Sequence, residues 1–271
     1  MKKYIGMKDF LLLIYRWMLT LLNIVPYYLL GRRSCNVQKI RKLKNSYSGK
    51  RCFIVCNGPS LRPEDLDKIH ENGDLSIGIN IIARIYPKTK WRPDFLFLTE
   101  DGAYKKKNSI VRNCEAGLKI FWDINYLRSL SFKGNKVFVR IRNSRHLLDN
   151  PKFTEDVTDF YYSIACTTYE TLEWARHLGC SEIYLIGCDM SYAVNLNRDG
   201  TIYYNNSGQN HFYAKDVDTQ SHIKPNPTWE MKVAFDFAEK YSKEHGFKIY
   251  NATRGGALEA FERVDFDSLF K

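Results

Sequence analysis

Short runs of apolar residues recur along the chain, each bounded by polar or turn-forming residues. Runs of this kind cover 52–56, 75–80, 95–99, 119–122, 136–139, 182–187 and 248–251. Segments with helical periodicity lie between them, one opening at Pro63 and two covering 167–178 and 228–244. Continuous apolar runs of this length are typical of parallel strands buried on both faces. The alternation therefore predicts an α/β, Rossmann-like fold with a mainly parallel sheet and helices on both faces.

One long segment departs from this alternation. Residues 190–227 are polar and aromatic, contain Gly200 and Gly208, and predict a loop or lid. The body of the protein then covers residues 51–271, in which 248–251 is the last predicted strand. Residues 1–50 form a separate N-terminal segment. A chain of 271 residues is ample for one hydrophobic core.

The N-terminal segment contains a hydrophobic stretch over residues 10–30. Polar residues at positions 9, 16, 20 and 23 fall on one stripe of a helix, and Leu, Ile, Trp and Met occupy the other faces. This pattern favours an amphipathic helix lying in a membrane interface. A true transmembrane anchor, or a helix packed on the domain or on a partner, remains an alternative. A signal peptide is disfavoured because Arg16 interrupts the apolar core.

The net charge of +11 is confined to this segment. Residues 1–51 hold twelve Lys and Arg and a single acid, Asp9, so the remaining chain is neutral overall. A basic segment beside a hydrophobic helix indicates an anionic membrane surface as partner. Nucleic acid is not expected, because a nucleic-acid binder would carry its charge on the folded domain. We expect a cytoplasmic protein, peripheral at the inner face of the membrane.

Polar residues follow several of the predicted strands, where ligands bind in open α/β sheets. Asn57-Gly58-Pro59-Ser60 joins a strand to a helix and suits either a phosphate or an ordinary turn with Ser60 as N-cap. Asn80 and Asp189 follow two other strands. The pair Glu100-Asp101 could bind a metal–diphosphate or a ribose hydroxyl, or could simply be a solvated loop pair.

Two histidines lie in the predicted lid, namely His211 and His222. A histidine there could act as a general base near neutral pH, although each suits a structural role almost equally well. The seven cysteines lack the spacing of a zinc site and are expected to be reduced thiols. No Ser-His-Asp order or nucleophile elbow is present, which disfavours a hydrolase.

Two motifs together resemble a known nucleotide-binding fold. They are Asn57-Gly58-Pro59-Ser60-Leu61 and the segment 178–189, LGCSEIYLIGCD. Both resemble the MptE-like group, named for 6-hydroxymethylpterin pyrophosphokinase, and the family-42 bacterial sialyltransferases, which use CMP-sialic acid. The segment 249–256, IYNATRGG, is more similar to the MptE-like group. The resemblance covers roughly residues 50–270.

The resemblance to the sialyltransferases implies roles for individual residues. Asn57, Gly58 and Asn80 would contact the donor nucleotide, and Thr167 and Thr168 would begin the helix that cradles the donor. Tyr192, with Tyr203 or Tyr204, would hold the leaving phosphate. His222 would be the base, four residues earlier than in the family, with His211 in reserve.

These observations lead us to expect a glycosyltransferase of cell-surface polysaccharide or lipopolysaccharide synthesis. Its donor would be a nucleotide sugar, preferably CMP-linked, and its acceptor a glycan or a lipid-linked glycan. No cofactor would be required. A first alternative is an MptE-like pyrophosphokinase that transfers diphosphate from ATP and requires Mg²⁺. A second is a non-catalytic scaffold that binds sugar nucleotides.

Overall fold

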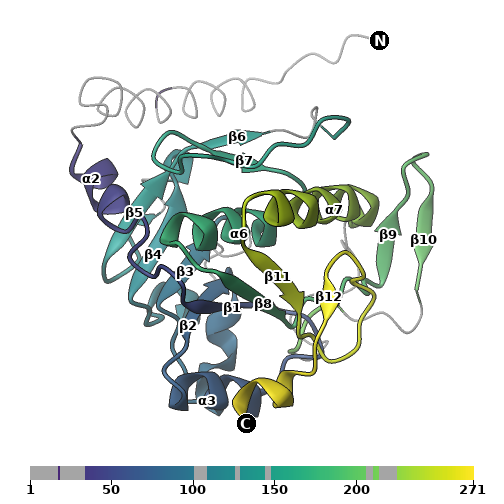
Figure 1. Cartoon of the computed structure of the whole chain (residues 1–271), viewed down its shortest axis with the longest axis horizontal. Coiled ribbons are helices and arrows are strands. Elements are labelled where there is room, and N and C mark those ends of the chain that lie inside the picture. The colour runs from purple at the N-terminus through teal and green to yellow at the C-terminus, as the bar shows by residue number, and fades with distance from the viewer. Residues whose placement is uncertain are drawn as a thin grey trace.

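The protein is built on one parallel sheet (Figure 1). The computed structural model describes Met18 and residues 34–100, 109–125, 129–143, 148–205, 210–213 and 225–271. Within these residues eight strands pair in the order β12-β11-β8-β1-β2-β3-β4-β5, and every pairing is parallel. The predicted α/β, Rossmann-like class is therefore confirmed.

The element bounds agree closely with the sequence pattern. The sheet strands are β1 Arg51–Val55, β2 Leu75–Ile79, β3 Phe95–Leu98, β4 Leu118–Trp122, β5 Lys136–Val139, β8 Glu182–Ile186, β11 Lys248–Asn251 and β12 Glu262–Arg263. The α-helices are α2 Cys35–Lys42, α3 Pro63–Glu71, α4 Ser109–Arg112, α6 Thr167–Leu178 and α7 Thr228–Glu244. The 3₁₀ helices are η2 Ile82–Lys88, η4 Asp123–Asn125 and η7 Phe266–Phe270. All seven predicted strands and three predicted helices are present.

The sheet is buried on both faces because successive side chains of each strand point to opposite sides. In β1, Ile54 belongs to the core that α6 and α7 cover, and Phe53 and Val55 belong to the core that α3 and η7 cover. Figure 1 shows these helices on the two sides of the sheet. Each strand buries alternate side chains in the two cores, so its sequence is a continuous apolar run.

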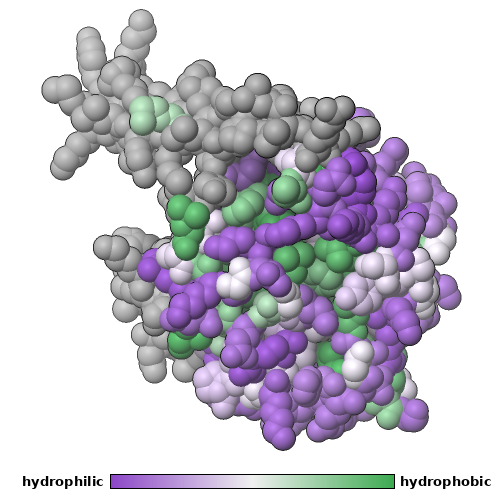
Figure 2. Space-filling model, turned by 90° about the vertical axis from the view of Figure 1, so that its left-hand side faces the viewer, coloured by the Kyte–Doolittle hydropathy of each residue, from purple (hydrophilic) through white to green (hydrophobic). Residues whose placement is uncertain are grey.

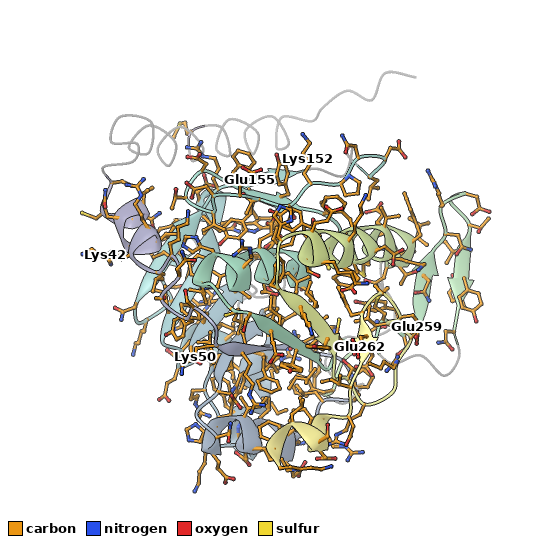
Figure 3. All side chains as sticks on the ribbon, viewed as in Figure 1. Lys42, Lys50, Lys152, Glu155, Glu259 and Glu262 are labelled. Carbon is orange, nitrogen blue, oxygen red and sulfur yellow. The ribbon has the colours of Figure 1, made fainter. Side chains whose placement is uncertain are left out.

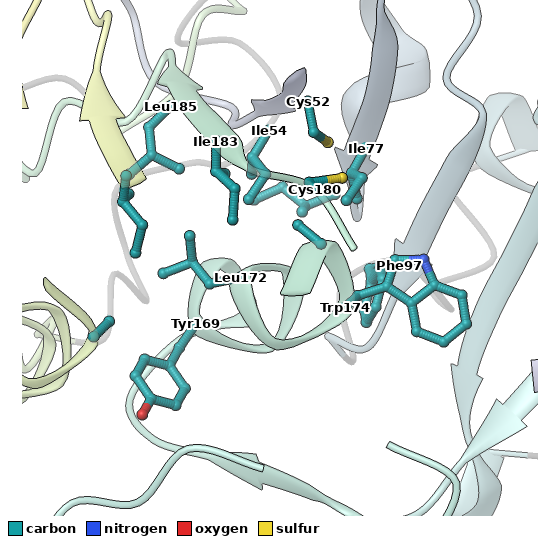
Figure 4. Packing of buried hydrophobic residues seen from close by; sticks show 14 of the residues in the cluster. Cys52, Ile54, Ile77, Phe97, Tyr169, Leu172, Trp174, Cys180, Ile183 and Leu185 are labelled. Carbon is teal, nitrogen blue, oxygen red and sulfur yellow. The ribbon is translucent and has the colours of Figure 1, made fainter. Parts of the chain in front are cut away.

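Helix α6 is the most enclosed α-helix of the described chain. All of its residues except Arg176 are buried, since the sheet, α7 and the small strand pair β6 and β7 surround it. Leu172 faces Ile183 and Leu185 of β8 (Figure 4). Gly179 ends the helix in the left-handed conformation, with φ of 86°, as the sequence predicted. Polar side chains on α6 must consequently find partners inside the protein.

The strands that the sequence did not predict are short. β6 Ile141–Asn143 and β7 Tyr161–Ser163 form one parallel pair, and β9 Val194–Leu196 and β10 Ile202–Tyr204 form an antiparallel hairpin. The hairpin stands off the body inside the predicted lid (Figure 1). The prediction that 248–251 is the last strand was wrong, because β12 pairs with β11 beyond it. Strands of two or three residues carry too little periodicity to be recognised.

The chain enters the body through α2, which covers the end of the sheet. Asn36 Nδ2 donates to the carbonyl of Phe138 and Asn36 Oδ1 accepts from its N–H, both at 2.7 Å. The side-chain amide thus pairs with edge strand β5 as a neighbouring strand would, and it blocks further pairing there. The helix predicted over residues 10–30 lies outside the described residues except for Met18. Among the described residues, we find no helix long and apolar enough to span a bilayer.

One buried hydroxyl in the core is expected to lower stability. Tyr161 is fully buried, and its Oη has no hydrogen-bond partner among the described residues. Tyr161→Phe should therefore raise the free energy of unfolding by up to about 1 kcal/mol in urea titrations, because an unsatisfied buried hydroxyl is costly. Tyr169→Phe is the matched control, since the Tyr169 hydroxyl donates to the carbonyl of Lys152 at 2.8 Å. That variant should lose about 1 kcal/mol, and equal losses in both variants would contradict the prediction.

Candidate active site

The carboxyl ends of β1, β2, β3 and β8 meet the beginning of α6 at one edge of the sheet. β1 is the point at which the strand order reverses, because β2 to β5 follow on one side and β8, β11 and β12 lie on the other. Ligands of open α/β sheets bind outside the carboxyl ends of the strands at such a reversal. The topology therefore brings together the strand ends that the sequence predicted to be functional.

Asn80 organises the end of β2. It is buried, and its Oδ1 accepts hydrogen bonds from the N–H groups of Thr99 and Glu100, each at 3.1 Å. Its Nδ2 donates to Thr167 Oγ1 at 3.2 Å. Thr167 Oγ1 lies 2.8 Å from Thr99 Oγ1. One asparagine thus joins β2, β3 and the first residue of α6.

Backbone strain is concentrated around this edge. Asn80, Ala165 and Met190 adopt left-handed conformations, with φ of 49°, 64° and 53°. Such conformations are unfavourable for residues with a side chain, above all for Ala and Met, and they gather at functional sites. All three residues adjoin the end of β2, the start of α6 or the end of β8. This is an independent structural indication that the edge is a site.

The first corner, which we define as residues 57–60, packs directly against the end of β8. Ser60 Oγ donates to Asp189 Oδ2 at 2.8 Å, and the Ser60 N–H lies 3.4 Å from the same oxygen. Burial raises the pKa of Asp189, and the bonds from Ser60 oppose this effect. Helix α3 begins only at Pro63 with Arg62 as its N-cap, so Ser60 does not cap it. The carboxylate of Asp189 therefore already accepts the hydrogen bond that the N–H of Ser60 could otherwise donate to a phosphate.

Asn57 offers an acceptor at the first corner. Its Nδ2 donates to the carbonyl of Ile79 at 3.1 Å, which fixes the amide orientation. Its Oδ1 is buried and has no hydrogen-bond partner among the described residues. A buried polar atom without a partner is costly, and a ligand can supply the missing donor.

One described segment of the lid, residues 210–213, contacts the first corner. The N–H of Phe212 donates to the carbonyl of Asn57 at 2.9 Å. The neighbouring ring of His211 stacks on Tyr213 with ring centroids 4.9 Å apart, and Arg84 lies over Tyr213 at 4.3 Å. The structure therefore brings His211 beside the corner, whereas His222 lies outside the described residues.

The start of α6 presents N–H groups that its own side chains leave open. Its N-cap residue, Cys166, makes no side-chain capping bond. The hydroxyl of Thr168 lies 3.5 Å from the thiol of Cys56. Free N–H groups and the helix dipole favour an anion at such an end. The start of α6 is consequently a better place for a phosphate than the first corner.

Two carboxyl groups around the start of α6 are electrostatically coupled. Burial, together with the nearby Glu100, raises the pKa of Glu170 to about 8. Desolvation also raises the pKa of Glu100, at the end of β3. The sequence did not single out Glu170, because a glutamate inside a helical pattern resembles a solvated face. Its position one turn after Thr167 is visible only once α6 is known to be buried.

The remaining predicted residues are distributed as follows. Tyr192 packs on the α6 side of the core, and burial close to Cys166 and Cys188 raises its pKa. Tyr203 lies on β10 and is 57% exposed, so the hairpin carries it away from the core. Asp101 lies outside the described residues. Among the residues that the structure describes, no group of three His, Cys, Asp or Glu could hold a metal ion.

Comparison with known proteins gives a family and two structural similarities. Residues 30–195, more than half of the chain, match the family described as 6-hydroxymethylpterin diphosphokinase MptE-like. The MAf glycosyltransferase of Magnetospirillum magneticum AMB-1 is 17% identical, with a TM-score of 0.46 over 84% of this chain, which spans only 38% of the length of that protein. No curated protein matches the sequence.

A mammalian sialyltransferase, solved in complex with Gal-beta-1-3GalNAc-ortho-nitrophenol, is a second structural similarity. It is 11% identical, with a TM-score of 0.36 over 89% of this chain and 86% of that chain. Neither of the two similarities identifies a substrate for this protein.

The close approach at the first corner gives a test of its geometry. A Cβ at Gly58 would overlap Asp189 Oδ2 and come within 2.5 Å of the carbonyl oxygen of Gly187. Gly58→Ala should therefore lower the free energy of unfolding by about 2 kcal/mol or more, measured in urea, because backbone atoms must move. Gly200→Ala is the control, since nothing lies within 4 Å there and only its φ of 85° opposes the change. A cost no greater than the roughly 1 kcal/mol expected for the control would disprove the packing described here.

Proposed function

This chain belongs to the 6-hydroxymethylpterin diphosphokinase MptE-like family, as its motifs predicted, and we propose that it is a glycosyltransferase that uses a nucleotide-activated sugar. The donor that we favour is CMP-linked, and the acceptor is a glycan or a lipid-linked glycan of cell-surface polysaccharide synthesis. The nucleotide lies along the carboxyl ends of β1, β2 and β3, with its phosphate at the start of α6.

The observation that carries this proposal is the hydrogen bond from Phe212 N–H to the carbonyl of Asn57, at 2.9 Å. It places a lid histidine, His211, beside the corner that holds an unpartnered buried acceptor. A general base next to a nucleotide site is what transfer to a hydroxyl group requires. His222 remains the alternative base from the sequence.

The chemistry of the proposed transfer uses three groups of the chain. His211 takes the proton of the acceptor hydroxyl while the acceptor oxygen attacks the anomeric carbon of the sugar. The bond from that carbon to the phosphate oxygen breaks, and the nucleotide leaves with the electron pair. Free N–H groups at the start of α6 and the hydroxyl of Tyr192 stabilise the charge that develops on the phosphate. None of these steps depends on a metal ion.

The position of the basic residues supports a peripheral site at the inner face of an anionic membrane. Lys39, Arg41, Lys42 and Lys44 are exposed on and just after α2, on a face that is mostly hydrophilic (Figure 2). Lys42 and Lys50 lie on one side of the molecule, and Glu259 and Glu262 lie on the opposite side (Figure 3). The basic residues of α2 would turn this side of the molecule toward anionic lipid and a lipid-linked acceptor.

The family itself favours a second candidate function. Its description is that of a diphosphokinase, which would transfer diphosphate from ATP and would bind ATP together with Mg²⁺. The two candidates differ in the nucleotide and in its dependence on metal, so a binding experiment separates them.

We expect CMP to raise the melting temperature of the protein in the presence of EDTA, in a screen that includes CDP, UDP, GDP and ATP with and without Mg²⁺. A ligand that binds only the folded state stabilises it by mass action. Asn57→Ala should weaken CMP binding about tenfold, because it removes the unpartnered acceptor. Asn72→Ala, at the exposed C-cap of α3, is the control. Stabilisation by ATP with Mg²⁺ alone would favour the diphosphokinase instead.

His211→Ala should slow the release of CMP from a CMP-linked acidic sugar by about a hundredfold or more, because a general base contributes at least that factor. The affinity for CMP should change less than threefold, since the base contacts the acceptor. His245→Ala, at the C-cap of α7, should behave as the wild type. Unchanged turnover of His211→Ala would exclude this histidine as the base.

A further inference from the structure

The ring of Tyr213 stacks with two side chains beside the first corner. The guanidinium carbon of Arg84 lies 4.3 Å from the centre of the ring. The imidazole of His211 lies 4.9 Å from it, centre to centre, and the two ring planes are only 10° apart. Arg84 belongs to the body of the protein, whereas Tyr213 and His211 belong to the lid. The tyrosine ring therefore connects the lid histidine to the body.

Arg84 stands on a rigid part of the body. It lies in η2, the 3₁₀ helix that follows the end of β2. Its neighbours Ile82, Ala83 and Ile85 are almost completely buried in the core on the α3 side of the sheet. The backbone at Arg84 cannot shift without disturbing this close-packed core. Its guanidinium is consequently a fixed surface against which a lid side chain can rest.

The backbone of the lid segment 210–213 is held by few contacts of its own. The segment forms neither helix nor strand. The N–H of Phe212 donates to the carbonyl of Asn57 at 2.9 Å, and Asn210 Oδ1 accepts from the N–H of Ala193 at the same distance. These bonds place the segment at the corner. They do not set the rotation of a side chain about its own bonds.

The stack on Tyr213 selects the plane of the imidazole. Two parallel rings in contact restrict rotation about the side-chain bonds of His211, because a turned imidazole would lose the contact. The Tyr213 ring is itself restrained from two directions. Phe212 packs against it edge to face, at 5.3 Å and 88°, and the guanidinium lies over its face. The order of support thus runs from Arg84 through Tyr213 to His211.

We propose that Arg84 and Tyr213 are positioning residues that hold the imidazole of His211 in one plane at the first corner. The acceptor lone pair of a neutral imidazole lies in the plane of the ring, so the plane decides which hydroxyl the ring can deprotonate. That His211 acts as a base rests on the proposed function. Neither Arg84 nor Tyr213 touches the ligand, and both act through the histidine.

The same helix η2 supplies a matched control. Arg92 lies over the ring of Tyr86, a residue of η2, at 4.2 Å from its centre. This stack has nearly the geometry of the one between Arg84 and Tyr213, but its ring lies in the body and not in the lid. Arg92→Met therefore removes a comparable contact from the same helix without touching the lid.

Nuclear magnetic resonance of the full chain, with ¹³C-labelled histidine, tests the arrangement without any ligand. The resonance of His211 is assigned by its loss in His211→Ala. A ring stacked on tyrosine is shielded, so its Cε1 proton should move to lower ppm than in Tyr213→Leu. Tyr213→Phe should keep the wild-type position, and Arg84→Met should move it toward that of Tyr213→Leu. Arg92→Met should leave it unchanged.

Turnover of CMP-sialic acid tests the consequence. Tyr213→Leu should lower kcat about tenfold and leave KM within about threefold, because it misorients the base and removes no contact to the donor. Arg84→Met should lower kcat about fivefold, since it removes only the cation that supports the ring. Tyr213→Phe and Arg92→Met should both stay close to the wild type. In the His211→Ala background, Tyr213→Leu should cause no further loss.

That background separates positioning from other roles. A further loss of turnover there would mean that Tyr213 supports the fold or contacts the ligand, and the proposal would be wrong. An identical His211 resonance in the wild type, Tyr213→Leu and Arg84→Met would overturn it equally. Arg84→Met repeats each comparison without altering the lid itself.

The two measurements also separate this proposal from the proposed function. If the resonance follows the expected pattern while none of the proteins turns over CMP-sialic acid, the stack holds the histidine and the proposed function fails. If turnover depends on His211 but is unchanged in Tyr213→Leu, the proposed function stands and the positioning role is wrong.

Discussion

The enclosure of helix α6 is the constraint on which the rest of this structure depends. A helix buried on every side must satisfy its polar side chains internally, and its free N–H groups lie only at its first turn. In this protein that turn lies at the carboxyl edge of the sheet, beside Asn80 and Thr99. The same burial that anchors α6 between the sheet, α7 and the β6–β7 pair therefore produces the polar site at its start.

Burial also divides the edge of the sheet into two chemically different parts. At the first corner, Asp189 and Asn57 present oxygen acceptors, and the N–H of Ser60 already faces a carboxylate. At the start of α6 no side chain caps the N–H groups, and Thr167 and Thr168 lie in the same turn. A ligand with an anionic end and a hydroxyl-bearing or amino-bearing end fits both parts in one orientation. The nucleotide of the proposed function has that composition.

Two buried carboxyl groups lie behind the site, those of Glu170 and Glu173. Glu170 and Glu173 point into the same interior, and burial raises the pKa of both. Such groups are costly in a core, and they persist where their hydrogen bonds position something else. Glu173 accepts from the backbone N–H groups of Thr154 and Tyr162 and so fixes β7 and the loop before it. Glu170 instead accepts from Ser163 Oγ and Trp122 Nε1 and so joins α6 to β7 and β4.

The sequence by itself determined the strands, the long helices and the family, because continuous apolar runs, helical periodicity and the NGPSL and LGCSEIYLIGCD motifs are local patterns. It also singled out Asn57, Asn80 and Asp189, since the ends of strands can be read from the pattern, whereas Thr167 came from the resemblance; the roles of all four remain predictions. Only the tertiary structure decided that Asp189 accepts a hydrogen bond from the N–H of Ser60, and that β12 extends the sheet. It alone revealed Glu170, because its hydrogen-bond partners, Trp122 and Ser163, come from two strands far apart in the sequence, β4 and β7. Contacts between residues far apart in the chain leave no periodic trace, so they emerge only when the sheet brings the strand ends together.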